Sequence, residues 1–281
     1  LIRRITPAGL SKTIKLKSLR RVISAGAPVP VKTIRDFSKL LKVKTQIFTP
    51  YGATEALPVT SIGSHEIIKE ALKPNQKERG ICVGKPVGDT DVSVIQISDD
   101  PITLWNSDLM LKNGEIGEIT VSGPQVTERY LNRDEANRLN KIKNQKTGQI
   151  HHRMGDLGYF DKYGRIWFCG RKSQRIITST ETLYTVPIEV VFNNHPAVFR
   201  SALVGIPFKE KQKPVVIIET EKPLNSKRQL KLKNELLELA LTSNLSRSID
   251  LILFHQNFPV DIRHNAKINR EKLGKWAAGE I

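Results

Sequence analysis

Hydrophobic and polar positions alternate over short stretches in the first half of the chain, which predicts strands and small helices separated by turns. Residues 19–28 (LRRVISAGAP) predict a strand ending in a Gly-Ala-Pro turn, and residues 45–48 predict a strand before a loop that begins at Thr49. Residues 31–41 repeat apolar side chains at helical spacing and predict an amphipathic helix. From residue 81 to residue 126, short apolar segments alternate with Gly and Pro, a texture typical of an antiparallel β-barrel or small sheet.

A hairpin and a second group of elements follow. Residues 140–148 are polar and predict a surface loop, and the segments DLGYF and RIWFCG predict a β-hairpin whose turn leaves Arg165 in solvent. Beyond Arg171 the pattern becomes that of an α+β domain, with helices and strands expected at residues 186–195, 198–206, 214–220, 225–242 and 250–254. We therefore predict a domain boundary between Arg171 and Lys172.

Length and charge narrow the class of protein. The chain has 281 residues, enough for two ordinary domains, and a formal net charge of +17. Its Lys and Arg residues are spread throughout, with modest enrichment at residues 11–21 and 226–233. Aromatic residues of the kind that stack on bases are not interleaved with them, so we expect a solvated basic surface and no nucleic-acid partner. Nucleic-acid binding is kept as the third of the functional alternatives.

The cellular compartment is predicted from cysteines and apolar runs. Cys82 and Cys169 lie in apolar, strand-like contexts, which favours buried thiols in a reducing cytoplasm over a disulfide. No apolar run reaches the about 18 residues that a membrane-spanning helix needs. The first residues, LIRR, lack the apolar core of a secretory signal. We expect a cytoplasmic protein without a transmembrane segment.

Two short polar motifs offer chemistry suited to a nucleotide. In residues 51–55 (YGATE), Gly52 allows a sharp turn, Thr54 offers a hydroxyl to a phosphate, and Glu55 is a hard oxygen ligand suited to Mg²⁺. The alternative is a surface turn with a capping Thr and a solvated Glu. Asp156 is a carboxylate of the kind that binds a ribose diol, or else a loop residue in an Asx turn.

His151 and His152 precede this second motif. No other metal ligand stands at a recognisable spacing from either histidine. We therefore expect both to be loop residues without a role in metal binding.

The motifs YGATE, MGDL, Gly170-Arg171 and the segment around Lys267 resemble, in type and order, the AMP-forming acyl-adenylating superfamily. That superfamily includes acyl-CoA synthetases, luciferases and the adenylation domains of peptide synthetases, and the match runs from about Arg20 to the C-terminus. The resemblance implies ATP and Mg²⁺ as cofactors and a fold of α/β and α+β parts. It implies that residues 1–171 are the C-terminal portion of the large AMP-binding domain, an α/β layer plus a small β-barrel, and that residues 172–281 are a small α+β lid.

The resemblance also implies a role for each residue of the candidate site. In the large domain, Tyr51 lies on adenine, Thr54 contacts phosphate, Glu55 binds the metal and Asp156 binds ribose. Gly52 shapes the same nucleotide-binding motif, and the other wall of the adenine slot is formed by Gly26, Ala27 and Pro28.

Three further residues have implied roles at the junction and in the lid. Arg171 contacts ribose or phosphate, Lys172 is the hinge on which the lid turns, and Lys267 reaches the carboxylate and the α-phosphate. The chain departs from the family pattern at Met154, where a Thr is usual, and at Ala266, where a Gly is usual.

The segment after Arg171 lacks a feature that would indicate CoA as the acceptor of the activated acyl group. CoA ligases of this family have a glycine-containing turn after the Gly-Arg motif, which shapes the pantetheine tunnel, whereas residues 171–189 contain no glycine. This argues against CoA. The phrases TPYGATEALPV, GPQVTERY and HRMGDLGY resemble the olefinic β-lactone synthetases of bacterial long-chain hydrocarbon biosynthesis.

That closer resemblance implies a substrate and a second step. The substrate is a long-chain fatty acid with a β-hydroxyl, which attacks its own adenylated carboxyl, closes a β-lactone and expels AMP. The pathway implies partner enzymes. A fatty acyl-CoA ligase is the alternative within the family.

The remaining alternative is a catalytically inactive adenylate-binding remnant. The family's Ser/Thr/Gly-rich phosphate loop, which ends in Pro-Lys, has no counterpart before residue 51, so the chain is expected to be part of a larger enzyme and inactive alone. For the same reason we expect exposed apolar surface around residues 19–25 and 45–48.

Overall fold

The computed structural model describes residues 2–26, 28–71, 80–261 and 267–281, so Ala27 and Ala266 lie outside the described residues. The chain divides into two compact units. The first comprises residues 1–76 and 82–168, and the second comprises residues 77–81 and 169–281.

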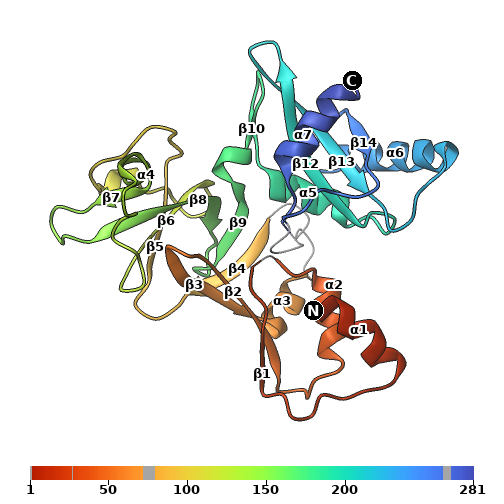
Figure 1. The fold of residues 1–281 in the computed structure, drawn as a ribbon, viewed down its shortest axis with the longest axis horizontal. Helices are drawn as coiled ribbons and strands as arrows, with labels where there is room; N and C mark the ends of the chain where they lie inside the picture. The colour runs from red at the N-terminus through yellow and green to blue at the C-terminus, as the bar shows by residue number, and fades with distance from the viewer. Residues whose placement is uncertain (1, 27, 72–79, 262–266) are drawn as a thin grey trace. The chain divides into compact units, whose positions relative to one another are not determined.

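Nine of the described strands form a large mixed sheet in the order β1-β2-β3-β4-β9-β8-β6-β5, with β7 paired to β8 (Figure 1). Their bounds are β1 (Arg21–Ile23), β2 (Gln46–Ala53), β3 (Ala56–Gly63), β4 (Ile81–Pro86), β5 (Asp91–Ile95), β6 (Gly117–Ser122), β7 (Lys141–Lys143), β8 (Ile150–Phe160) and β9 (Ile166–Arg171). β1 and β2 are parallel, whereas β5, β6 and β8 pair antiparallel, as the alternating texture after residue 81 predicts. Strand β7 occupies part of the segment predicted as a loop, so that prediction was wrong there.

The first three helices of the chain gather at the β1 end of this sheet, whereas α4 (Asp134–Asn140) lies beside β7 and β8 (Figure 1). The first three are α1 (Ile2–Ser11), α2 (Val31–Ser38) and α3 (Ser64–Ala71), while the 3₁₀ turn η2 (Ser107–Leu109) lies farther along the chain. Helix α2 has the predicted amphipathic character, because Ile34 and Phe37 are buried in one cluster with Ile47 of β2. The expected exposure was therefore wrong at residues 45–48, where Ile47 is 0% exposed, and right at β1, where Ile23 is 65% exposed.

The YGATE motif lies on a β-hairpin and not on the loop that the sequence predicts. β2 continues through Thr49, Pro50 and Tyr51 to Ala53, and β3 begins at Ala56. The pairing slips between Tyr51 and Ala53, and Gly52 lies within this bulge. A Cβ at Gly52 would lie 2.6 Å from the carbonyl oxygen of Ala56, so the close approach of the two strands requires glycine.

Three polar side chains expected on loops are buried in the first unit. Arg165 is 4% exposed, since its guanidinium forms ion pairs with Asp161 at 2.6 Å and with Glu70 of α3 at 2.8 Å. His151 and His152 lie within β8 and are 4% and 3% exposed. Sequence spacing missed these positions because each is buried by an element distant along the chain.

The second unit is a sheet between helices. Its strands β12 (Arg200–Phe208), β13 (Lys211–Glu219) and β14 (Ile252–Phe254) pair in that order, and β10 (Ile176–Ile177) and β11 (Thr182–Leu183) form a small hairpin. The helices are the 3₁₀ turn η3 (Lys172–Gln174), α5 (Thr185–Asn193), α6 (Ser226–Leu241) and α7 (Arg270–Gly279). Helices α5 and α6 and strands β12, β13 and β14 agree with the elements predicted after Arg171, whereas η3, β10, β11 and α7 were not predicted.

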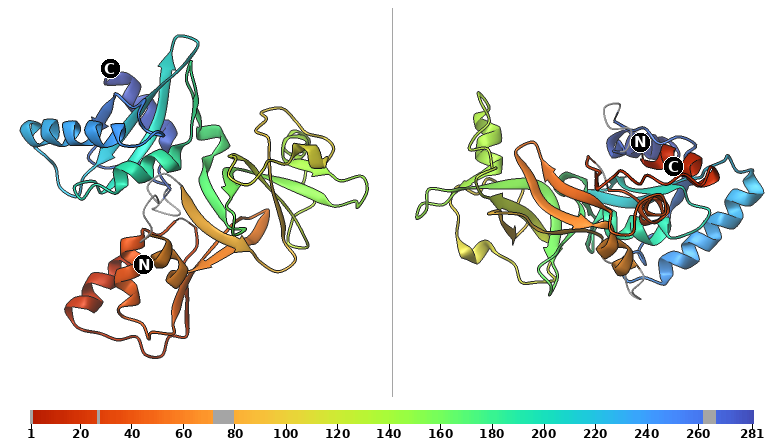
Figure 2. Two further views of the ribbon diagram at one scale, coloured as in Figure 1. Left: turned by 180° about the vertical axis from the view of Figure 1, so that it is seen from behind. Right: turned by 90° about the horizontal axis from the view of Figure 1, so that it is seen from below.

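Two hydrophobic clusters hold the layers of the second unit together. One face of the sheet, with Leu203 and Val216, packs on α5 and α6 through Phe192 and Leu236. The opposite face packs on α7 through Leu273. Figure 2 shows α6 and α7 on opposite sides of the three strands. Among the described residues, none of the helices is both long enough and apolar enough to cross a membrane.

Candidate functional site

The first unit brings Tyr51 and Asp156 together from strands that are 105 residues apart in sequence. The Tyr51 hydroxyl donates a hydrogen bond of 2.7 Å to Oδ2 of Asp156, and the Tyr51 ring lies 6.1 Å from that of Phe168 on β9. Asp156 is 5% exposed, and the preceding Gly155 has a φ of 63°, a left-handed conformation that favours glycine. The carboxylate is thus held by the tyrosine of the other motif.

Glu55 lies at the other end of the same motif, in the turn between β2 and β3. Its Oε1 accepts a hydrogen bond of 2.9 Å from the Tyr130 hydroxyl, and its backbone carbonyl accepts one from the Thr127 amide. The Lys141 ammonium lies 5.3 Å from the centre of the Tyr130 ring and donates to the Thr127 hydroxyl at 3.0 Å. Thr54, in contrast, is exposed.

Electrostatics around Glu55 favour its charged form. Partial burial alone would raise the pKa of Glu55, but its backbone amide, the Tyr130 hydroxyl and nearby positive charge lower it below the ordinary value. Burial lowers the pKa of Lys141 to about 8, an effect that the Glu55 charge opposes. Burial and the charge of Glu55 raise the pKa of Tyr130, so its hydroxyl stays a donor at neutral pH.

Gly26 and Pro28 follow the carboxyl end of β1, which is parallel to β2 and so points the same way as the strand that carries Tyr51. In the parallel pair of β1 and β2, Ile23 is the register partner of Phe48, so Gly26 and Tyr51 each stand three residues beyond a paired position. Both Gly26 and Pro28 are exposed, and Gly26 has a φ of 95°. The candidate wall formed with Ala27 is described only at its two ends.

Three candidate residues belong to the second unit. Arg171 is exposed at the end of β9, and Lys172 begins the turn η3. Lys267 is exposed, and its carbonyl accepts a hydrogen bond of 2.9 Å from the Asp261 amide. Val260 and Ile268 form an antiparallel β-bridge, so Lys267 is next to a residue whose backbone pairs with another segment.

Sequence reasoning missed Tyr130, Lys141 and Phe168. Tyr130 ends the phrase GPQVTERY, which carries part of the resemblance, but nothing in the local pattern connects this tyrosine with Glu55, 75 residues earlier. The described residues contain no group of three or more His, Cys, Asp or Glu side chains that could hold a metal alone.

The chemistry of this arrangement suits a phosphorylated nucleoside. A buried carboxylate at Asp156 can accept hydrogen bonds from a diol, and an aromatic ring beside it can stack on a base. An ionised carboxylate at Glu55 suits a hard cation, with the Thr54 hydroxyl one residue away available to a phosphate oxygen.

Known proteins resemble this chain over most of its length. Residues 2–131 match the family described as AMP-binding enzyme. The chain is 42% identical over 266 residues to an olefin beta-lactone synthetase of Xanthomonas campestris pv. campestris, covering 94% of this chain and 48% of that protein. The olefin beta-lactone synthetase of Stenotrophomonas maltophilia is 42% identical over 269 residues, 95% of this chain and 48% of the relative. The chain spans about half the length of the curated relatives it matches.

Solved structures share its fold. O-succinylbenzoate coenzyme A synthetase from Bacillus subtilis, in complex with AMP, superposes with a TM-score of 0.69 at 23% identity, over 96% of this chain and 49% of that chain. The amide bond synthetase from Marinactinospora thermotolerans gives 0.71 at 19% identity, over 98% and 55%. At this identity the likeness concerns the fold alone, and it confirms the predicted combination of α/β and α+β parts.

Proposed function

We propose that this chain, which belongs to the family of AMP-binding enzymes, holds the adenylate in an ATP-dependent, AMP-forming activation of a carboxylic acid. The contact between Tyr51 and Asp156 carries the proposal, because it joins the two motifs on which nucleotide binding depends. Asp156 accepts hydrogen bonds from the ribose hydroxyls, while Tyr51 orients this carboxylate and presents its ring to adenine. The role proposed for Gly26 and Pro28, with Ala27 between them in the sequence, is the opposite wall of the adenine slot.

The turn between β2 and β3 supplies the groups that we propose contact the phosphates and the metal ion. The Thr54 hydroxyl donates to a phosphate oxygen, and Glu55, kept ionised beside Tyr130, supplies a carboxylate oxygen for Mg²⁺. Mg²⁺, when bound, would neutralise phosphate charge while a carboxylate oxygen of the acid attacks the α-phosphorus of ATP and pyrophosphate leaves. Arg171 adds a cation for ribose or phosphate, Lys172 is the hinge, and Lys267 stabilises the negative charge on the reacting carboxylate and α-phosphate. The large-domain portion is then residues 1–171 and the lid residues 172–281.

A long-chain β-hydroxy fatty acid is the substrate we propose. The 42% identity to proteins named olefin beta-lactone synthetase supports it, and so does the glycine-free hairpin of β10 and β11, whose turn is closed by the Thr178 hydroxyl on the Glu181 carbonyl. The β-hydroxyl oxygen attacks the activated carbonyl carbon, the carbon–phosphate oxygen bond breaks, and AMP leaves. The fatty acyl-CoA ligase is the second candidate.

Titration calorimetry tests nucleotide binding directly. A non-hydrolysable acyl-AMP analogue is expected to bind the purified chain, and Asp156→Ala is expected to weaken this binding about 10- to 100-fold, the usual loss for a hydrogen bond to a charged group. Asp89→Ala, an exposed acid of the same unit, is the matched control and should bind as the original chain does. A folded chain that binds no analogue would contradict the proposal.

The nucleophile that accepts the acyl group is tested by supplying the acyl-adenylate ready made. Chemically prepared 3-hydroxyacyl-AMP should release AMP and give β-lactone without CoA, whereas acyl-AMP without the hydroxyl should not. AMP release that requires CoA would favour the ligase. Binding of the analogue without release from either compound would favour the inactive remnant. We propose a cytoplasmic protein, since Cys82 and Cys169 are both free thiols, which suits a reducing compartment.

A further inference from the structure

Two loops of the first unit lie against each other at the end of the sheet beside β1. The Leu16 amide donates to the Leu40 carbonyl at 2.7 Å, and the Lys15 ammonium donates to the Lys39 carbonyl at 2.7 Å. The Thr45 hydroxyl donates to the Leu19 carbonyl at 3.0 Å. Residues 12–23 and residues 39–45 therefore form one continuous surface, which we call the basic–apolar face.

Positive charge is concentrated at this face. Residues 12–23 and 39–45 together contain eight Lys and Arg side chains and no acid, which gives +8 of the whole chain's net +17. The nearest acid in the sequence between them is Asp36 of α2. Asp36 is paired with Lys39 at 2.7 Å, so among the described residues it leaves the other cations of the two loops without an acidic partner. Of this face, the sequence pattern marks only residues 11–21 as enriched in Lys and Arg, because residues 39–45 join them in space and not along the chain.

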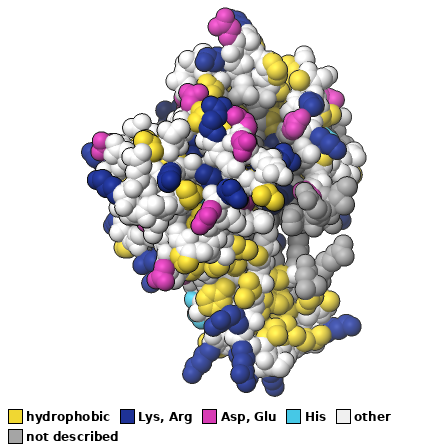
Figure 3. Space-filling model, turned by 60° about the vertical axis from the view of Figure 1, so that its left-hand side comes forward, with side chains coloured by type: hydrophobic (Ala, Val, Ile, Leu, Met, Phe, Trp, Pro, Cys, Tyr) yellow, Lys and Arg dark blue, Asp and Glu magenta, His cyan; other side chains and the backbone are white. Residues whose placement is uncertain are grey.

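Apolar side chains project from the same loops. Val43 is 90% exposed and stands between Lys42 and Lys44 at the turn of its loop, and Ile14 is 42% exposed. Figure 3 shows hydrophobic side chains together with Lys and Arg side chains at the lower end of the view, where these segments lie. An exposed apolar side chain between two lysines combines an inserting group with flanking cations.

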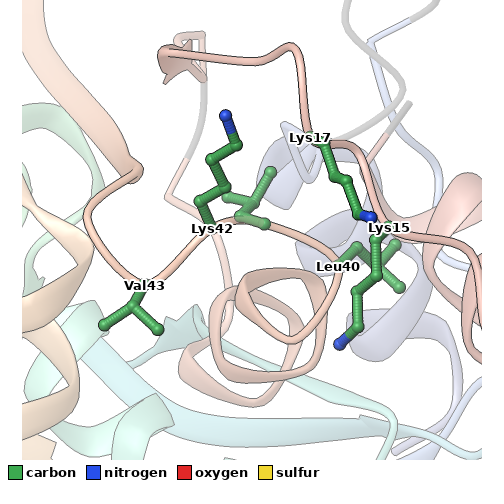
Figure 4. Close-up of a pocket in the computed structure, with 6 residues that line it drawn as sticks. Lys15, Lys17, Leu40, Lys42 and Val43 are labelled. Carbon is green, nitrogen blue, oxygen red and sulfur yellow. The ribbon is translucent and has the colours of Figure 1, made fainter.

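A shallow depression of about 320 Å³ lies within the face. Leu40, Leu41 and Val43 form its apolar lining, and three lysines surround it, Lys15, Lys17 and Lys42 (Figure 4). The lining of the depression thus combines aliphatic carbon with lysine side chains. An amphiphile with an anionic head matches both parts.

We infer that the basic–apolar face docks on an anionic lipid surface. Each Lys or Arg close to such a surface strengthens binding by about fivefold at physiological salt, and apolar side chains at a loop tip add to this by entering the headgroup region. The inference does not depend on the proposed enzyme activity, although a surface-bound protein would meet long-chain substrates where they partition.

The positive charge of the basic–apolar face argues against a protein partner at this surface. The centre of a protein–protein interface is depleted in lysine, because burying an ammonium without an acidic partner is costly. A second copy of this chain would bring a second face with a charge of +8 against the first. The remaining length of a longer polypeptide would have to cover the same lysines, whereas lipid phosphates pair with them and leave them hydrated.

Vesicle flotation of the full chain tests the inference. Vesicles of phosphatidylcholine and phosphatidylglycerol are expected to carry the chain to the top of the gradient at physiological salt, and pure phosphatidylcholine vesicles are not. Lys15→Glu/Lys17→Glu/Lys42→Glu should lower the partition coefficient about 100-fold or more. Val43→Asn, which removes an exposed apolar group, should lower it about tenfold.

A matched variant distinguishes binding through the basic–apolar face from an effect of the chain's net charge. Lys222→Glu/Lys227→Glu/Arg228→Glu makes the same charge change at exposed cations of the second unit, and it should keep most of the binding. Equal losses in the two triple variants would overturn the inference, since charge would then act without a site. So would a chain that stays unbound to anionic vesicles, and self-association abolished by the first triple variant would then assign the face to a second copy. Adenylate binding by the same vesicle-incompetent chain would leave the proposed function intact.

Discussion

Arg153 is the most fully engaged charged residue near the candidate site. It lies on β8, three residues before Asp156, and is 2% exposed. Its guanidinium pairs with Glu118 of β6 at 2.5 Å and also donates to the carbonyls of Asp100 and Leu139 at 2.9 and 3.0 Å. One side chain therefore ties β8 to β6, to a loop and to the end of α4.

Replacing this residue should destabilise the first unit strongly. Arg153→Met removes the charge that faces Glu118, and breaking a buried ion pair from one side costs about 3–5 kcal/mol of the free energy of unfolding. Urea denaturation followed by circular dichroism measures this loss. Arg153→Met/Glu118→Leu should recover much of it, because no buried charge is then left. A single variant within about 1 kcal/mol of the original chain would contradict the assignment.

His152 makes the first unit sensitive to acid. Its Nδ1 lies 3.1 Å from the Asn140 carbonyl, which can only accept, so Nδ1 carries the proton of the neutral ring. Burial, reinforced by the Lys141 charge, lowers the pKa of His152 to about 4. The folded state therefore binds its proton at a lower pH than the unfolded state does.

The sign of the pH effect follows from this lowered pKa. Above about pH 6.5 the ring is neutral in both states and its contribution to stability is complete; as the pH falls toward 4, the unfolded chain takes up the proton first and stability is lost, by up to about 3 kcal/mol. His152→Gln should flatten the fall in the free energy of unfolding between neutral pH and pH about 4. His65→Gln, at an exposed histidine, should leave the slope unchanged, and an unchanged slope for His152→Gln would show that other groups cause the fall.

Elements were predictable from sequence where local spacing determines them. Helices α2 and α6 follow from apolar residues at helical intervals, and both match the segments expected. The continuation of β2 through Pro50 did not follow, because proline lacks an N–H for pairing. The pairing of β1 with β2 ends at Phe48. Beyond Phe48, the β1 side of β2 has no partner strand in this pairing, so a proline without an N–H at position 50 breaks no hydrogen bond to β1.

The candidate site divides in the same way. Tyr51, Glu55 and Asp156 could be predicted because each lies in a short motif with its own chemistry. Tyr130 could not, since its role depends on a hydrogen bond to a residue 75 positions away. Sequence periodicity reports which side chains share a face, and it does not report which strands are neighbours.

Helix α6 offers a prediction at the level of one element. It begins after Asn225, whose side chain accepts a hydrogen bond of 3.0 Å from the Arg228 amide and so satisfies one of the amides at the helix start. Asn225→Ala should cost about 1 kcal/mol of the free energy of unfolding, measured by urea denaturation of the second unit. Asn225→Ser keeps an acceptor and should cost much less. Equal losses for the two substitutions would mean that the cap contributes nothing.

At the scale of the whole molecule, the second unit has what independent folding requires. Its two hydrophobic clusters are composed of residues from 176 onward, and they cover both faces of the β12-β13-β14 sheet. Helices α5 and α6 cover one face and α7 covers the other, so the sheet needs no element from the first unit to complete its core. This supports the domain boundary between Arg171 and Lys172 that we propose.

A chain of residues 172–281 alone is therefore expected to unfold cooperatively in urea. Leu236 is 0% exposed at the centre of the α6 cluster, so Leu236→Ala should cost about 2–5 kcal/mol in this shortened chain and lower one transition of the full chain by the same amount. Leu230→Ala deletes the same atoms from a site on α6 that is 62% exposed, and should change stability by less than about 0.5 kcal/mol. If the shortened chain showed no transition, or if Leu236→Ala displaced every transition of the full chain together, the two units would be one cooperative structure and the boundary would have no thermodynamic meaning.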